Sequence, residues 1–84
     1  MKHFASSQFW DCYEQLSSAR KSVADKNFDL LKVNPAHPSL HFKRVGNLYS
    51  VRVGIGHRAL GAQVEGGVVW FWIGTHAEYD KLVG

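Results

Sequence analysis

Acidic residues are missing from the middle of this 84-residue chain. Between Asp29 and Glu65 there is no aspartate or glutamate, while the same stretch carries lysines, arginines and histidines. The net charge of +3 therefore comes from this segment. Its residue pattern is strand-like, so we expect the positive charge to be held on a sheet. A fixed basic surface on a small domain indicates a polyanionic partner, and nucleic acid is the most common one.

Cysteine and long apolar runs are also scarce. The single cysteine, Cys12, allows no disulfide within the chain and no thiolate metal site, which fits a reducing compartment. The longest apolar run, Val68–Ile73, is far shorter than the roughly 20 residues that cross a bilayer. Because Lys2 is not followed by a long apolar run, we expect no signal peptide, no membrane contact and a cytoplasmic protein.

Motifs for metal binding and for nucleophilic hydrolysis are absent too. His37 and His41 stand four residues apart, but Pro38 between them argues against a helix that would align them. No serine or cysteine lies in a recognisable nucleophile motif. We therefore expect no metal site and no cofactor.

The residues that are present predict one folded domain over residues 1–84. The chain is 45% hydrophobic and 13% aromatic, which is too apolar for a disordered chain. Ser6 or Ser7 can cap a first helix, whose apolar stripe follows helical spacing: Phe9, Cys12, Tyr13 and Leu16. A second helix is expected over Ala19–Val33, ending at Asn34 because Pro35 follows.

The second half of the chain predicts strands separated by glycine turns. The expected strands are Leu40–Lys43, Tyr49–Val53, Arg58–Glu65 and Val68–Ile73. The last is apolar on both faces and is expected in the centre, with Trp70 and Trp72 on one side and mostly in the core. A short helix over Ala77–Leu82 closes the chain. The prediction is an α+β fold: an N-terminal helical hairpin on a four-stranded antiparallel sheet. A short extra edge strand at Lys2–Phe4 is left open.

Two segments resemble a known family. They are "PSLHFKRVGNLYSVRVGIGHRALG", residues 38–61, and "WFWIGTHAEYD", residues 70–80. Together with the helical part "FDLLKVNPAHPSL", they are similar to the RelE/ParE superfamily of bacterial toxins, especially a compact branch ending in "WIGTHAEYDKL". The likeness lies in the ordered set of elements rather than in one short motif.

The resemblance implies both a fold and a function. Members have an α+β fold with a four-stranded antiparallel sheet. Many are toxins of toxin–antitoxin systems that cut mRNA on the ribosome without a metal, and a small antitoxin neutralises them. Partners would then be mRNA, the ribosome and a cognate antitoxin. ParE-type members instead inhibit DNA gyrase, and an inactive module that binds nucleic acid or an antitoxin is a third alternative.

The resemblance also implies which residues would act. Arg58, just after a glycine turn, matches a phosphate-stabilising arginine, and Arg52 matches a basic position on the preceding strand. His76 matches a catalytic histidine or arginine, and Tyr79 a tyrosine that stacks on a base or assists proton transfer. An ion pair for Arg58, a cap for His76 and packing for Tyr79 are the structural alternatives. Four further residues are expected to contact RNA phosphates: Lys43, Arg44, His41 and His57.

These residue types suit metal-free RNA cleavage. Arginine binds phosphate oxygens through its planar fork and keeps its charge, and histidine moves protons near neutral pH. Whether Arg52 and Arg58 share a face depends on their hairpin. A two-residue turn at Ile55-Gly56 separates them, and a three-residue loop pairs them directly.

The sequence also departs from one ribonuclease branch of the family. Ser50 stands where that branch has a lysine, and His76 where it has an arginine. That branch also continues into a longer C-terminal helix. These differences leave loss of catalytic activity open.

Overall fold

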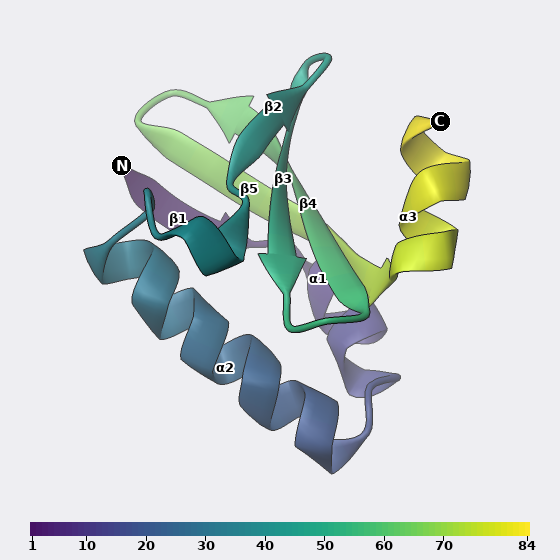
Figure 1. Cartoon of the computed structure of the whole chain (residues 1–84). Coiled ribbons are helices and arrows are strands. Elements are labelled where there is room, and N and C mark those ends of the chain that lie inside the picture. Colours follow the sequence, from purple (N-terminus) through teal and green to yellow (C-terminus); the bar gives the residue numbers. More distant parts are fainter.

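The chain forms a strand, two helices, four further strands and a final helix. The structure is a computed structural model that describes all 84 residues (Figure 1). Its elements are β1 (Lys2–Ala5), α1 (Ser7–Glu14), α2 (Ser18–Val33), the 3₁₀ helix η1 (Pro38–Leu40), β2 (Lys43–Val45), β3 (Leu48–Val53), β4 (His57–Val64), β5 (Gly67–Thr75) and α3 (His76–Val83). None of these helices is long and apolar enough to cross a membrane.

The sheet has five strands in the order β1-β5-β4-β3-β2. β1 runs parallel to β5, and every other neighbouring pair is antiparallel. The predicted four-stranded antiparallel sheet is therefore wrong: the extra edge strand that the sequence left open at Lys2–Phe4 forms as β1, and the sheet is mixed. Gly67 permits this extra pairing, because a Cβ at that position would lie 2.1 Å from the carbonyl oxygen of Lys2.

Both predicted N-terminal helices form, and serine side chains cap them. Ser6 Oγ accepts a hydrogen bond from the Phe9 N–H of α1, and Ser17 Oγ accepts one from the Arg20 N–H of α2. Such caps satisfy backbone donors that a first helical turn leaves free. α2 ends at Val33, immediately before the predicted stop at Asn34-Pro35.

The predicted strand over Leu40–Lys43 is largely replaced by a 3₁₀ turn. Pro38 occupies the first position of η1, where its fixed φ is favourable, and His41 then adopts a left-handed φ of 44°. β2 starts only at Lys43. The turn places Leu40 in the hydrophobic core, where it is fully buried.

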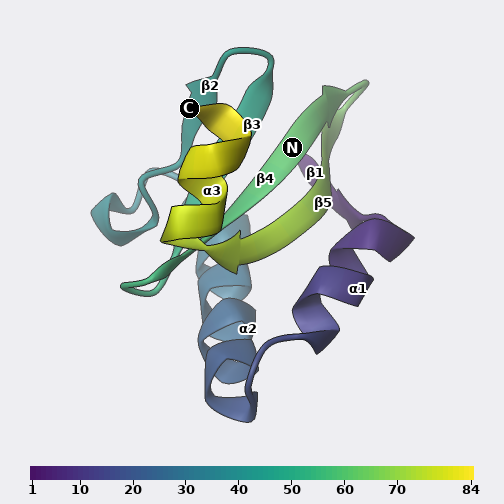
Figure 2. The same cartoon turned by 90° about the vertical axis from the view of Figure 1, so that its right-hand side faces the viewer.

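The sheet separates two layers of different character. Val51, Val53 and Ala59 belong to the core beneath α1 and α2, whereas α3 lies against the opposite face (Figures 1 and 2). A β-bulge in β5 splits its two tryptophans between these faces. Trp72 pairs with Leu60 and Trp70 with Gly61, which are consecutive residues of β4. The prediction that Trp70 and Trp72 share one side is therefore wrong.

Gly61 offers a test of packing on the core face. A Cβ there would lie 2.4 Å from Val68 Cγ1 and 2.9 Å from Trp70 Cε3. We expect Gly61→Ala to lower the free energy of unfolding by about 1–3 kcal/mol through overpacking. Gly56→Ala is the matched control, since nothing lies within 4 Å of its added methyl group. Urea denaturation of both variants measures the effect, and equal midpoints would contradict this packing.

Candidate functional site

The β3–β4 hairpin brings Arg52 and Arg58 together. Arg52 lies directly opposite Arg58, and Val53 opposite His57, so the loop between the strands holds three residues. The first of them, Gly54, has a φ of +66°, which glycine adopts without strain. Directly opposed residues of an antiparallel pair point to the same face of a sheet. The hairpin therefore adopts the second of the two registers that the sequence left open.

Arg58 is held on this face without a carboxylate partner. Its side chain is 7% exposed, and Nη1 donates to Ser50 Oγ at 3.3 Å. The guanidinium carbon lies 5.0 Å from the centre of the Tyr79 ring, a cation–π distance. Nε is buried without a hydrogen-bond partner. No aspartate or glutamate pairs with Arg58, so its charge is not neutralised by an ion pair.

α3 places Tyr79 next to this arginine and His76 next to Tyr79. Thr75 and Glu78 form a capping box at the start of the helix, and the His76 N–H donates to Gly56 O at 2.9 Å. Tyr79 is buried, and the centre of its ring lies 5.8 Å from that of His76. The exposed His76 has Nε2 3.6 Å from Asp80 Oδ1. A guanidinium, a phenol and an imidazole thus follow one another across the sheet–helix junction.

Lys43 extends the positive charge along the same face. It lies opposite Ser50, the residue that hydrogen-bonds Arg58, and it is exposed. We call the set Lys43, Arg52 and Arg58 the cationic face. Ser50 is a functional candidate that sequence reasoning missed. The sequence marked Ser50 only as a departure from the lysine of one ribonuclease branch, because a small hydroxyl carries no motif of its own.

Of the four residues predicted to contact RNA, only Lys43 belongs to the cationic face. Arg44 pairs with Tyr49 on the other face, where Nη1 donates to Gln63 Oε1 at 2.6 Å and the guanidinium lies 5.2 Å from the Tyr49 ring centre. His41 is exposed at the end of η1, outside the sheet. Strand alternation explains the position of Arg44: successive side chains of a strand point to opposite faces, and its neighbour Lys43 points to the cationic face.

His57 also points away from Arg58, because the two are consecutive in β4. It lines a pocket of about 370 Å³ with Arg20, Trp72 and Glu78. Burial, with the nearby Arg20 charge, lowers the pKa of His57 below 6.5, and Glu78 opposes this shift. Its Nδ1 is buried without a partner. Hydrogen bonds from the Thr75 N–H and hydroxyl lower the pKa of Glu78, so this carboxylate stays ionised near neutral pH.

The lowered pKa of His57 predicts how stability depends on pH. Between the folded pKa and 6.5 the unfolded chain binds more protons, so stability is complete above 6.5 and falls as the pH drops through this window. We expect His57→Gln to flatten the dependence of the thermal midpoint between about pH 7 and pH 5. His3, whose pKa burial also lowers, should account for a residual slope. An unchanged profile in His57→Gln would contradict this assignment.

Comparison with known proteins finds similarity at the level of the fold. No protein-family model and no curated protein matches the chain. A chain of the RelB-RelE antitoxin-toxin complex from Methanococcus jannaschii matches with a TM-score of 0.72 and 9% identity, over 96% of this chain and 99% of that one. YafQ from E. coli strain BL21(DE3) matches with a TM-score of 0.68 and 15% identity, over 93% of this chain and 96% of that one. The isolated E. coli RelE toxin matches with a TM-score of 0.63 and 10% identity, over 95% of this chain and 93% of that one. The fold that the resemblance implied is thus confirmed: the chain has a RelE-like fold.

Proposed function

We propose that this chain is the toxin of a toxin–antitoxin system and an endoribonuclease that cuts mRNA on the translating ribosome without a metal. The observation that carries the proposal is the cross-strand pair Arg52–Arg58, which has no carboxylate partner; the Arg58 guanidinium lies over the ring of Tyr79, and that ring neighbours His76. The RelE-like fold supports it, and one protein with this fold forms an antitoxin-toxin complex. A cognate antitoxin is therefore the expected protein partner.

The proposed reaction uses the RNA's own 2′-hydroxyl as nucleophile. Its oxygen attacks the adjacent phosphorus while a base removes its proton, and the P–O5′ bond breaks as an acid protonates the leaving oxygen. A 2′,3′-cyclic phosphate and a 5′-hydroxyl result. Guanidinium groups stabilise the extra negative charge on the crowded phosphorus. Because Arg58 is 7% exposed, the phosphate meets the half-buried Arg52 and the exposed Lys43 first.

A non-catalytic binding module is the second candidate. The burial of Arg58 beneath Tyr79 favours it, because an arginine so enclosed can serve the structure alone. Such a module would bind RNA in a salt-dependent way, with Lys43 and Arg52 contacting phosphates. Cleavage assays on translating ribosomes separate the two candidates.

The two faces of the sheet provide a matched pair of arginine variants. Expression of the wild-type chain should arrest bacterial growth and truncate transcripts. Arg52→Ala and Arg58→Ala should each lower the cleavage rate by about 10²–10³-fold, because each removes charge stabilisation. Arg44→Ala removes the same charge from the opposite face and should leave the rate nearly unchanged. Circular dichroism establishes that each variant is folded. Intact transcripts with abundant folded wild-type protein would overturn the nuclease proposal.

The difference in exposure between His76 and Tyr79 predicts different roles. His76 is exposed and able to reach a substrate, whereas Tyr79 is 5% exposed and its ring contacts Arg58. We expect His76→Ala to slow cleavage by about 10²-fold through loss of a proton-transfer group. Tyr79→Phe keeps the ring and should retain most activity. Tyr79→Ala should lower the free energy of unfolding by about 3 kcal/mol. A large loss of rate in Tyr79→Phe, with an unchanged melting temperature, would instead assign the proton transfer to the phenol.

A further inference from the structure

A pocket of about 370 Å³ gathers polar side chains from both halves of the chain. Arg20 lines it from α2, His57 from β4 and Glu78 from α3, and Gln15 lies at the end of α1. We call it the polar pocket. None of the three residues of the cationic face lines it. Its volume lies within the range of small-molecule sites in proteins.

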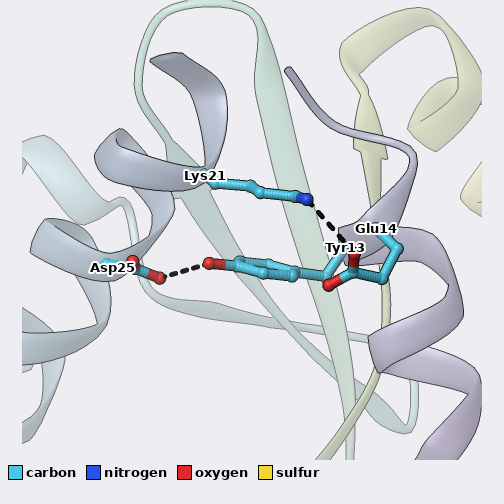
Figure 3. Close-up of polar contacts among 4 residues, drawn as sticks. All are labelled: Tyr13, Glu14, Lys21 and Asp25. Carbon is cyan, nitrogen blue, oxygen red and sulfur yellow. Dashed lines mark hydrogen bonds and ion pairs between the residues drawn. The ribbon is translucent and has the colours of Figure 1, made fainter. Parts of the chain in front are cut away.

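Two polar contacts fix the corner between α1 and α2 that forms one wall of the polar pocket. The Tyr13 hydroxyl donates to Asp25 Oδ1 at 2.9 Å, and Lys21 Nζ lies 3.2 Å from Glu14 Oε2 (Figure 3). These contacts engage the two carboxylates that are nearest to Arg20 in the sequence. Arg20 itself forms no ion pair, so its guanidinium is free to bind an anionic group.

A carboxylate is held at the opposite wall by the capping box of α3. The Thr75 N–H and hydroxyl both donate to Glu78 Oε1 at 2.9 Å, which lowers the pKa of Glu78 and keeps it ionised. Oε1 and Trp72 Cη2 each lie 3.0 Å from the point where a Cβ of residue 74 would stand, so Gly74 lets the carboxylate and the indole ring adjoin. Glu78 has no cation partner, and its Oε2 is free to accept from a ligand.

His57 adds a ring nitrogen that lacks a partner. Its Nδ1 is buried without a hydrogen bond. The charge of Arg20 lowers the pKa of His57 and that of Glu78 raises it, so both charges act on this imidazole. Nδ1 of a neutral imidazole either donates or accepts, according to its tautomer. Titratable groups with shifted pKa values that converge on one hollow are typical of a binding site.

We propose that the polar pocket binds a small zwitterion, an α-amino acid with an apolar side chain, whose carboxylate contacts Arg20 and whose ammonium group contacts Glu78. Arg20 and Glu78 do not pair with each other, so one ligand can bridge them. An anion alone would be repelled by Glu78, and a cation alone by Arg20. The half-buried Leu16 and Trp72 and the buried Ile73 supply an apolar wall for the side chain of the ligand.

The zwitterion also satisfies His57. Its ammonium group donates to an accepting Nδ1, and its carboxylate accepts from a donating one, so either tautomer gains a partner. An RNA backbone offers negative charge without a cation and would meet the Glu78 carboxylate. The proposal therefore goes beyond RNA cleavage and does not depend on it, and its test needs no activity assay.

Three compounds with one carbon skeleton test the charge requirement on the full chain. L-leucine carries both charges, isocaproate lacks the ammonium group and isoamylamine lacks the carboxylate. Binding is followed by the indole N–H signals in NMR, because Trp72 lines the polar pocket whereas Trp10 and Trp70 do not. We expect L-leucine to shift Trp72 alone, with a Kd on the order of 1 mM. Each analogue should bind at least about fivefold more weakly.

Charge-removing variants inside and outside the pocket supply matched controls. Arg20→Gln and Glu78→Gln should each weaken L-leucine binding at least about fivefold. The amide oxygen in Glu78→Gln still accepts from Thr75, so α3 stays capped. Arg44→Gln and Asp80→Asn remove the same charges outside the pocket and should leave the Kd unchanged. Circular dichroism establishes that each variant is folded.

Three results would overturn the proposal. In the first, none of the compounds shifts the Trp72 signal. In the second, isocaproate or isoamylamine binds as tightly as L-leucine, which would leave a site for one charge only. In the third, the variants outside the pocket weaken binding as much as those inside it.

Discussion

The register of the β3–β4 hairpin decides which side chains meet on each face of the sheet. With three residues in its loop, Arg52 pairs with Arg58, and Val51 pairs with Ala59. Strand alternation then sends the arginines to one face and the small apolar side chains to the other. A shift by one residue would place guanidinium groups under α2 and valines beneath α3. One loop thus determines both where the core forms and where positive charge collects.

The surroundings of Arg58 suit the binding of an anion better than they stabilise the folded chain. Its contact with the Tyr79 ring contributes about 0.5–2 kcal/mol, and Ser50 supplies one hydrogen bond. The buried, unpartnered Nε costs about 1–3 kcal/mol in the opposite direction. A carboxylate partner would stabilise this arginine more, but it would also cancel the positive potential of the face. Because the charge of the Arg58 guanidinium is unpaired, it favours the binding of an anion from solution.

Local patterns in the sequence predicted most elements but not the features that depend on distant contacts. Serine caps, the proline stop after Val33 and the glycine turns identified both N-terminal helices and the strands from Tyr49 onward. β1 is four residues long and pairs in parallel with a strand at the other end of the chain, so no local turn reveals it. The bulge that separates Trp70 from Trp72 likewise has no local signal. At the candidate site, residue types suggested Arg52, Arg58, His76 and Tyr79. Only the register shows that Lys43 and not Arg44 shares the face of Arg58, and only packing shows that Ser50 accepts a hydrogen bond from Arg58.

The parallel pairing of β1 with β5 has a consequence for how the chain is made. β1 is synthesised well before the residues it pairs with, Gly67–Trp70. The sheet therefore cannot acquire β1 until the segment through β5 has been translated. Contacts between such distant segments are slow to form, because closing a long loop loses chain entropy before any pairing is gained. The nascent chain consequently exposes the aromatic side chains of its early segments until late in synthesis, and during that time another protein in the cell could bind them.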